Sequence, residues 1–291
     1  MDGQELSNGD QMRKQTPKEK ITHTGGTLVE NMGNWMNRIV IGHPVTGSVR
    51  IEWVMSRYGQ TIPTNWSHMD IIQFMSPYVP LKYQVADAEN LIAKSVIDQN
   101  AEWLLFWEHD NIPPNDALIK INEYMIEGKV PIVGGVYFTK SVPPEPLVYR
   151  GIGNGHFADW RIGDKVWCSG VPFGFTLIHG AIIKAMWDES PEYQIGSITT
   201  RRVFNAPAKS WMDQASGAYL STGGTSDLAW CERVIKERFF EKAGWPQYQG
   251  VKYPFLIDTG IFVHHIDQEG RRFPLEIPMR YKPNGKVREI K

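Results

Sequence analysis

Short apolar runs alternate with stretches of helical periodicity in the first half of the chain. The run Trp103–Trp107 is apolar at every position, which is typical of a central strand covered on both faces. Shorter runs predict further strands at 39–41 and 130–137, and apolar residues spaced three or four positions apart predict helices between them. The residues expected to face inward are Ile51, Val54, Met55 and Tyr58 in the first helix, Ala88, Leu91, Ile92 and Val96 in a second helix at 86–99, and Leu118, Ile121 and Met125 in a third.

This alternation of strand and helix predicts an α/β domain whose central sheet is mixed, mainly parallel and flanked by helices. The second half of the chain is less regular. Residues 195–225 are polar and show no period, which predicts a functional loop that contains Trp211. The other elements expected here are a strand at 171–178, a helix at 181–187, an amphipathic helix at 227–240 with Ser226 as its N-cap, and strands at 255–257 and 261–263.

Length and composition fit one large domain. The chain has 291 residues, of which 42% are hydrophobic and 22% charged, and both values are ordinary for a globular protein. Residues 1–35 are polar and aperiodic, so we expect a disordered tail. A single domain is expected over 36–270, with halves at 36–150 and 151–270, and a basic extension follows at 271–291.

Net charge indicates which partners to expect, and cysteine content indicates the compartment. The formal net charge of -1 offers no electrostatic argument for a nucleic-acid or membrane partner. Cys168 and Cys231 lie far apart and form no metal or disulfide motif, so we expect two reduced thiols. No apolar run approaches the ~20 residues of a membrane helix, and the N-terminus lacks the apolar core of a signal peptide. The expectation is a cytoplasmic protein without an anchor of its own.

Two carboxylates follow the central strand directly, in the sequence Glu108-His109-Asp110. Residues i and i+2 of a strand point to the same side, so both project together beyond the carboxyl end of the sheet, where open α/β sheets place ligands. Oxygen ligands of this kind suit Mg²⁺ or Mn²⁺, which can bridge a diphosphate and neutralise a leaving group. A solvated turn is the alternative interpretation of an isolated acidic pair.

Two later positions could complete such a site. An apolar run ends in His264-His265, and an imidazole could add a metal ligand, although an isolated histidine is more often a packed or surface residue. Thr225-Ser226-Asp227 opens a predicted helix, where capping and the helix dipole alone favour an acidic residue. Alternatively, Asp227 is a general base that accepts the proton of an attacking hydroxyl.

A segment of small and aromatic residues at 167–175 is a candidate ligand wall. It contains Gly170 and Gly174, whose missing side chains let a backbone approach a ligand closely, and its aromatic rings could pack on a sugar. The chain has no P-loop, no HExxH and no GxSxG motif. The glycine-rich stretch at 151–155 lacks the spacing of a dinucleotide site, so we discount one.

The order and spacing of these features over roughly residues 38–266 resemble the GT-A glycosyltransferases, in particular the inverting, family-2-like group. Glu108-His109-Asp110, followed by its proline turn, looks like the Asp-x-Asp motif of that family. Ser226-Asp227 looks like the Glu-Asp motif whose aspartate is the base.

The late segment at 258–266 resembles the family segment whose histidine reaches the metal, and its spacing favours His265, with His264 as the alternative. The strand at 39–44 looks like the opening strand whose end contacts the nucleotide. Ala88-Glu89-Asn90 takes the place of an Ala-Arg-Asn segment. The residues that the resemblance implies in donor binding are Pro44, Val45, Asn90, Glu108, Gly170 and Gly174.

The activity implied by the resemblance is metal-dependent transfer of a sugar from a UDP- or GDP-sugar to an acceptor hydroxyl, with inversion. Asp110 would hold Mn²⁺ or Mg²⁺, Glu108 would touch the ribose or the ion, and His265 would close the metal site. Asp227 would be the base. Residues 36–150 would form the nucleotide-sugar half and 151–270 the acceptor half, with the loop at 195–225 as an acceptor lid. Glycans, lipids, proteins and modified nucleic-acid bases all stay open as acceptors.

Three departures from the family pattern keep other functions open. Glu108 stands in place of the usual first aspartate, Ser226 in place of a glutamate and Glu89 in place of an arginine. A non-catalytic carbohydrate-binding or assembly protein is one alternative that these departures allow. A nucleotidyltransferase of related fold would use the same metal chemistry, but the chain lacks an obvious glycine-rich, basic loop after its first strand.

Overall fold

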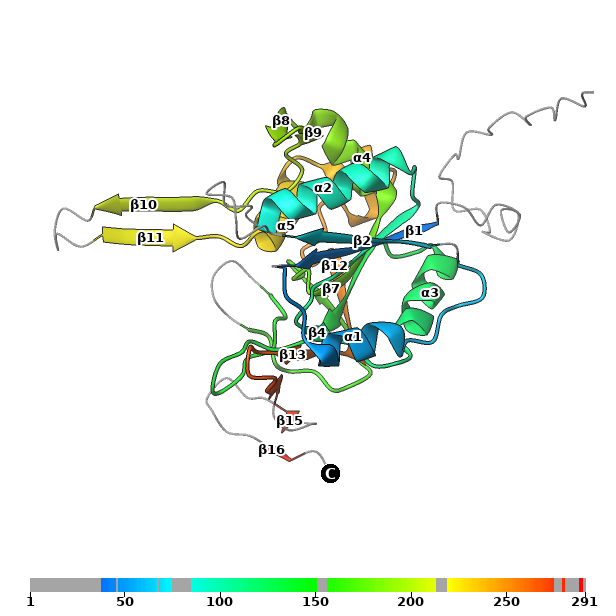
Figure 1. Cartoon of the computed structure of the whole chain (residues 1–291), viewed down its shortest axis with the longest axis vertical. Coiled ribbons are helices and arrows are strands. Elements are labelled where there is room, and N and C mark those ends of the chain that lie inside the picture. Colours follow the sequence, from blue (N-terminus) through cyan, green and yellow to red (C-terminus); the bar gives the residue numbers. More distant parts are fainter. Residues whose placement is uncertain are drawn as a thin grey trace, which may run out of the picture.

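The computed structural model describes residues 38–45, 47–66, 68–74, 85–150, 156–212, 219–274, 279–280 and 288–289, so the predicted tail at 1–35 lies outside the described residues. They form a single α/β domain with helices on both faces of a seven-stranded sheet of order β2-β1-β3-β7-β5-β12-β6 (Figure 1). The strands of this sheet are β1 (Ile39–Val45), β2 (His68–Phe74), β3 (Trp103–Trp107), β5 (Ile132–Val136), β6 (Lys165–Cys168), β7 (Phe175–His179) and β12 (Phe255–Phe262).

Most strands of this sheet run in one direction. β2 and β3 are parallel to β1, β3 and β5 are both antiparallel to β7, and β12 is parallel to β5. Within the sheet, β7 and the edge strand β6 run the opposite way. The predicted mixed, mainly parallel sheet is therefore confirmed. As a consequence, the carboxyl ends of β1, β3, β5 and β12 meet at one edge, where ligands of α/β sheets bind.

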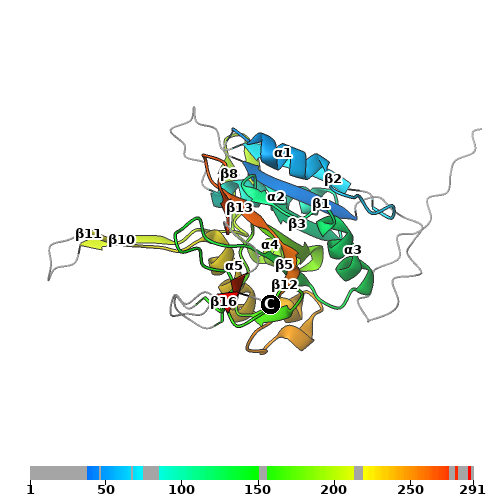
Figure 2. The same cartoon turned by 90° about the horizontal axis from the view of Figure 1, so that it is seen from below.

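The helices divide into two layers (Figures 1 and 2). One face of the sheet packs against α2, α4, α5 and α6, and the other packs against α1 and α3. The third predicted helix and its inward residues are confirmed, and Gly128 ends it in a left-handed conformation with φ of 57°. The bounds are α1 (Ile51–Tyr58), α2 (Val85–Asp98), α3 (Ala117–Glu127), α4 (Gly180–Glu189), α5 (Ser226–Lys236) and α6 (Phe239–Lys242).

The apolar run at 103–107 is the central strand β3, as predicted. Its side chains alternate between the two layers: Trp103, Leu105 and Trp107 pack on the α1–α3 side, while Leu104 and Phe106 pack on the α2–α4–α5 side. All five residues are at most 1% exposed. A strand buried on both faces can be apolar throughout because neither face contacts water.

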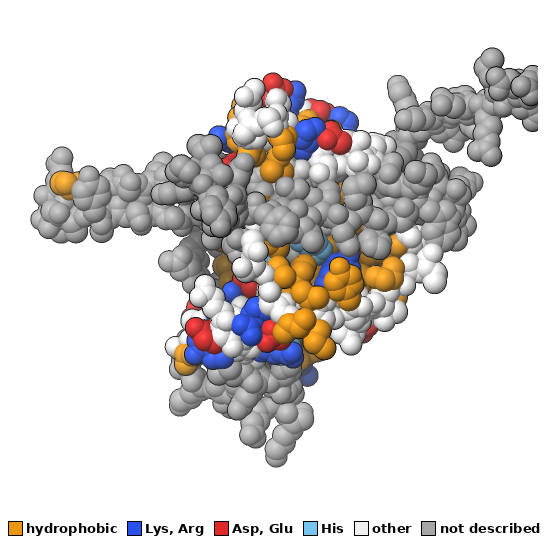
Figure 3. Space-filling view, in the orientation of Figure 1, with side chains coloured by type: hydrophobic (Ala, Val, Ile, Leu, Met, Phe, Trp, Pro, Cys, Tyr) orange, Lys and Arg blue, Asp and Glu red, His pale blue; other side chains and the backbone are white. Residues whose placement is uncertain are grey.

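The predicted inward face of the first helix is wrong for three of its four residues, since only Val54, which is half-buried, packs against the core. Ile51, Met55 and Tyr58 are 65%, 69% and 83% exposed, whereas Trp53 and Arg57 of α1 are buried. The Trp53 ring packs edge-on against the rings of His43 and Trp107, at centroid distances of 5.1 and 6.2 Å. The helix buries one large aromatic ring that packs on two other rings, and most of the predicted apolar stripe is left on the surface. Hydrophobic side chains gather over the region of α1 in the space-filling view (Figure 3).

The region at 195–225 contains strands rather than one loop. β8 (Glu192–Ile195) pairs with β9 (Ile198–Arg201), and β10 (Ala208–Met212) pairs with β11 (Tyr219–Gly223), both antiparallel. The β10–β11 pair projects from the body of the molecule (Figure 1), with Trp211 on β10. Residues 213–218, which connect the two strands, lie outside the described residues.

Three further boundaries differ from the prediction. The strand at 171–178 begins only at Phe175, after a glycine- and proline-containing segment, and 255–257 and 261–262 belong to the single strand β12, which ends at Phe262. The helix at 227–240 divides into α5 and α6 because Arg238 adopts a left-handed conformation with φ of 60°. Thr225, not Ser226, is the N-cap of α5.

Small elements complete the structure around the carboxyl edge of the sheet. β4 (Asn111–Ile112), β13 (His264–Ile266) and β14 (Arg272–Phe273) form a three-stranded sheet in the order β14-β13-β4. β15 (Met279–Arg280) pairs with β16 (Arg288–Glu289).

Cys168 and Cys231 are buried and free, as predicted. Within the described residues, no helix combines the length and the apolar character needed to cross a membrane.

Candidate functional site

The segment Glu108-His109-Asp110 lies at the carboxyl end of β3, and backbone hydrogen bonds fix its first and last residues. The Glu108 N–H donates to the Gly174 carbonyl at 3.0 Å, and the Ile266 N–H donates to the Asp110 carbonyl at 2.7 Å. These bonds connect the segment to the turn before β7 and to β13. Residues far apart in sequence are thereby brought to one end of the sheet, where the predicted site was expected.

Asp110 has three polar side-chain neighbours. Its Oδ2 lies 2.5 Å from Lys140 Nζ and 3.3 Å from His265 Nε2, and its Oδ1 accepts from Asn111 Nδ2 at 3.0 Å. Burial opposes ionisation of this carboxyl, but the His265 hydrogen bond and the His265 and Lys140 charges outweigh it and lower the pKa of Asp110. Asp110 is therefore an anion at neutral pH and can bind a cation.

The structure places His265, and not His264, beside Asp110. His265 Nδ1 lies 2.9 Å from the Phe138 carbonyl, which accepts a hydrogen bond from it and leaves Nε2 directed at Asp110. A backbone acceptor on one ring nitrogen is the arrangement that orients metal-binding histidines. This geometry agrees with the preference for His265 in the predicted metal site.

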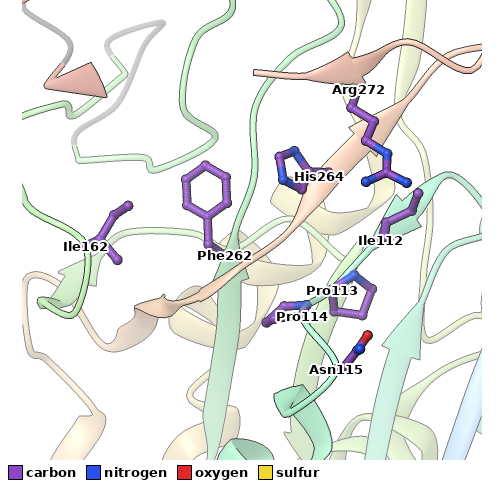
Figure 4. Close-up of a pocket in the computed structure, with 8 residues that line it drawn as sticks. All are labelled: Ile112, Pro113, Pro114, Asn115, Ile162, Phe262, His264 and Arg272. Atoms are coloured by element: carbon purple, nitrogen blue, oxygen red, sulfur yellow. The ribbon is translucent and has the colours of Figure 1, made fainter. Parts of the chain in front are cut away.

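His264 points to the other side of β13, because neighbouring strand residues face opposite ways. It lines a pocket of about 350 Å³ with Phe262 and Arg272 (Figure 4). Its Nδ1 is buried and has no hydrogen-bond partner among the described residues. Burial and then the Arg272 charge lower the pKa of His264. His264 is therefore separated from the carboxylates by its own strand.

Four carboxyl groups gather at this edge of the sheet. Burial raises the pKa of Glu108 well above its usual value, and the nearby charges of Asp110, Glu89 and Asp227 raise it further. The Lys140 ammonium acts in the opposite direction. Glu108 thus lies close enough to Asp110 and Asp227 for their charges to raise its pKa, and Glu89 is a further carboxyl group of this region that was not predicted.

Asp227 lies in the first turn of α5. Its Oδ1 accepts from the Leu228 N–H at 2.7 Å, and a further backbone hydrogen bond joins its carboxyl to Phe173 in the glycine-containing segment before β7. Burial raises the pKa of Asp227, although hydrogen bonds from Thr225, Leu228 and Phe173 oppose the rise. A carboxylate whose pKa is raised towards neutrality is a better general base than an exposed one.

Glu89 is the carboxyl group that sequence reasoning missed. It is 1% exposed, and its Oε1 accepts from Ser226 Oγ at 2.9 Å, while Oε2 has no partner among the described residues. Burial raises the pKa of Glu89 to about 8, and the charge of Asp227 contributes to the rise. A signal was available, because Glu89 precedes Ile92 and Val96 at helical spacing and so lies on the buried face of α2.

Three residues predicted in donor binding have their side chains in the protein interior. Pro44 and Val45 are buried at the end of β1, and the Pro44 carbonyl lies 3.2 Å from His109 Nδ1. Asn90 is 1% exposed, and its amide bonds to both backbone groups of Phe204, with N···O distances of 2.8 and 2.9 Å. These side chains therefore support the wall of the site rather than face a ligand.

Gly174 is required by packing beside the site, whereas the closest neighbour of Gly170 is the flexible end of Leu228. A Cβ at Gly174 would lie 2.5 Å from Tyr137 Oη and 2.7 Å from Asn111 Nδ2, and a Cβ at Gly170 would lie 2.9 Å from Leu228 Cδ2. The Gly174 N–H also donates to Tyr137 Oη at 2.8 Å. Gly174 therefore lets the segment before β7 pack tightly against Tyr137 and Asn111.

We expect Gly174→Ala to destabilise the fold by about 1–3 kcal/mol, because two buried and bonded groups must shift to admit a methyl group. Urea unfolding of the two proteins measures this difference. Gly170→Ala is the matched control, since its methyl group would meet only the flexible end of Leu228. Equal unfolding free energies for Gly174→Ala and the native protein would contradict the packing argument.

The residues at this edge fit a partial site for a divalent cation. Within the described residues, no group of three or more His, Cys, Asp or Glu side chains is arranged to hold a metal ion. Asp110 Oδ2 and His265 Nε2 nevertheless converge, and Mg²⁺ or Mn²⁺ is usually held by one or two protein ligands together with substrate phosphates. Asp110 and His265 would hold such an ion, and a diphosphate would supply the remaining oxygens.

Comparisons with known proteins leave the family of the chain open. No protein-family model matches the chain, and no curated protein matches it at a significant level. Among solved structures, it is similar to the A197 protein from STIV, with 16% identity and a TM-score of 0.46, over 87% of this chain and 98% of that one. It is also similar, with 13% identity and a TM-score of 0.26, to a Bacillus anthracis protein assigned as a glucose-1-phosphate thymidylyltransferase in complex with a sucrose, over 51% of this chain and 56% of that one. Both likenesses are too distant to indicate a function, so function is argued from the site.

Proposed function

We propose that the protein is a metal-dependent, inverting glycosyltransferase with a GT-A-like arrangement, which transfers a sugar from a UDP- or GDP-sugar to an acceptor hydroxyl. One observation carries the proposal. Asp110 and His265 converge on one point, and Asp227, whose pKa is raised, lies at the same carboxyl edge of the sheet. Asp110 and His265 form the position for the cation, and Asp227 forms the position for the base. The proposed metal-dependent sugar transfer uses both.

The proposed reaction gives one role to the cation position and another to Asp227. Mg²⁺ or Mn²⁺, when bound, supplies electrostatic stabilisation of the departing diphosphate. Asp227 accepts the proton of the acceptor hydroxyl while the hydroxyl oxygen bonds to the anomeric carbon and the bond from that carbon to the diphosphate breaks. Because the new bond forms on the face opposite the leaving group, the anomeric configuration inverts.

The β10–β11 hairpin is the proposed acceptor element. Its base is fixed by the Gly224 N–H, which donates to the Pro207 carbonyl at 2.8 Å, and α5 begins only three residues after β11. An acceptor held by the hairpin would therefore be delivered to the first turn of α5, where Asp227 lies. This connection supports the proposal that the region at 195–225 closes over the acceptor.

Product analysis tests the proposed reaction class. The protein is incubated with UDP- and GDP-sugars and Mn²⁺, and separately with nucleoside triphosphates and sugar 1-phosphates. Release of nucleoside diphosphate in the first set supports the glycosyltransferase. Release of pyrophosphate in the second set would instead identify a nucleotidyltransferase, and sugar binding without turnover in either set would identify a binding protein.

A further inference from the structure

Lys140 lies on an exposed loop at the mouth of the candidate site. The loop follows β5, and two hydrogen bonds between Thr139 and Glu145 close its base. The Thr139 N–H donates to the Glu145 carbonyl at 2.9 Å, and the Glu145 N–H donates to Thr139 Oγ1 at 2.9 Å. The Lys140 side chain reaches back from this closed base to Asp110, and the side chain keeps 30% of its surface exposed. Its flexible stem is therefore free to move without disturbing the fold.

The ammonium of Lys140 takes the position that a divalent cation would need. Its Nζ lies 2.5 Å from Asp110 Oδ2, the same oxygen that lies 3.3 Å from His265 Nε2. A divalent cation bound between Asp110 and His265 would lie within a few ångströms of Nζ, and like charges at that distance repel each other. Lys140 and the cation therefore compete for Asp110 Oδ2.

A nucleoside diphosphate offers Lys140 a second anionic partner at the same place. Lysine binds phosphate as a mobile point charge, and a cation held by two protein ligands takes its remaining oxygens from water or from phosphate. An arriving diphosphate thus favours the cation on Asp110 and the ammonium on the phosphates at once. The Asp110–Lys140 pair is thereby replaced by an Asp110–cation pair and a Lys140–diphosphate pair.

We propose that Lys140 is an exchange residue, which occupies the cation position on Asp110 in the free protein and moves to the donor diphosphate when the cation and nucleotide bind. The inference rests on the proposed function and adds a nucleotide-binding residue to it. It implies that the cation and the nucleotide bind cooperatively. The nucleotide draws Lys140 away from the cation position, and the cation releases Lys140 from Asp110 so that it can bind the nucleotide.

Binding measurements on Lys140→Gln test the exchange without any turnover. Mn²⁺ affinity is measured by electron paramagnetic resonance of free Mn²⁺ in the absence of nucleotide, and UDP and GDP affinities are measured by calorimetry at saturating Mn²⁺. We expect Lys140→Gln to bind Mn²⁺ about three- to tenfold more tightly, because a partly exposed competitor is lost, and to bind the nucleoside diphosphate more weakly by a similar factor.

Two controls separate this result from a general change of charge. Lys140→Arg keeps the cation and should behave as the native protein does. Lys184→Gln removes an exposed lysine that pairs with Asp188 at 2.8 Å on α4, and it should change neither affinity. The opposite signs of the two effects distinguish exchange from a structural defect, which would weaken both.

Unchanged or weaker Mn²⁺ binding by Lys140→Gln would overturn the inference, and so would unchanged nucleotide binding. If the native protein binds neither UDP nor GDP, the proposed function fails. The Mn²⁺ titration still decides in that case whether Lys140 competes for the cation position, so the two failures are distinguishable.

Discussion

Asp227→Asn is expected to lower sugar transfer by on the order of 10²–10⁴-fold, because the acceptor hydroxyl loses its general base. Asparagine keeps the shape of the side chain, and its amide oxygen can still accept from the Leu228 N–H, so the first turn of α5 should persist. Donor binding should stay within about twofold, since the base contacts the acceptor and not the diphosphate. Transfer rates and donor affinity are measured on the same preparation.

The matched control for this substitution is Asp188→Asn, which neutralises an exposed carboxylate near the end of α4. Its transfer rate should equal that of the native protein. Near-native transfer by Asp227→Asn would remove Asp227 from the role of base. A loss of transfer accompanied by a loss of donor binding would point instead to a role in holding the donor.

Glu89→Gln is expected to stabilise the fold at pH 8 by a few kcal/mol and to leave stability at pH 4 nearly unchanged. The folded-state pKa of Glu89 is about 8, against 4.5 for the ordinary carboxyl, so between these pH values the folded chain holds a proton that the unfolded chain has lost. Stability of the native protein should therefore fall as pH rises through this window, by up to about 1.4 kcal/mol per pH unit, and should level off above it.

Glutamine mimics the protonated acid and does not titrate, and its amide oxygen can still accept from Ser226 Oγ. Urea unfolding of both proteins at several pH values between 4 and 9 measures the effect. Glu232→Gln, on the exposed side of α5, is the control and should follow the native profile. If Glu89→Gln lost stability with pH in parallel with the native protein, Glu89 would not be the buried proton carrier.

The strongly periodic parts of the fold could be predicted from the sequence, because burial alone determines them. β3 is apolar at every position since helices cover both of its faces, and α3 buries the three residues that its spacing indicated. α1 shows the limit of this reasoning. The sequence offers both an apolar stripe and Trp53 as an inward face, and only the positions of His43 and Trp107 in space show which face is preferred.

The place of Glu108 and Asp110 could be predicted because both follow the central strand, and the carboxyl ends of parallel strands meet at one edge of the sheet. Lys140 could not be predicted, since nothing in a lone lysine on a loop indicates that it reaches an aspartate 30 residues away. Glu89 could have been recognised as a buried residue from its place on α2, but its contact with Ser226 depends on how two distant helices pack. The chemical role of these residues therefore depends on tertiary contacts.

The measurement that tests the proposed function most directly is Mn²⁺-dependent release of nucleoside diphosphate by the native protein, Asp110→Asn and Asp188→Asn. Our account predicts release by the native protein and by Asp188→Asn, loss of release on addition of chelator, and a decrease on the order of 10²-fold in Asp110→Asn, because the leaving diphosphate loses its stabilising charge. Release that is unaffected by chelator and by Asp110→Asn would contradict the assignment of this edge of the sheet as a metal-dependent transfer site.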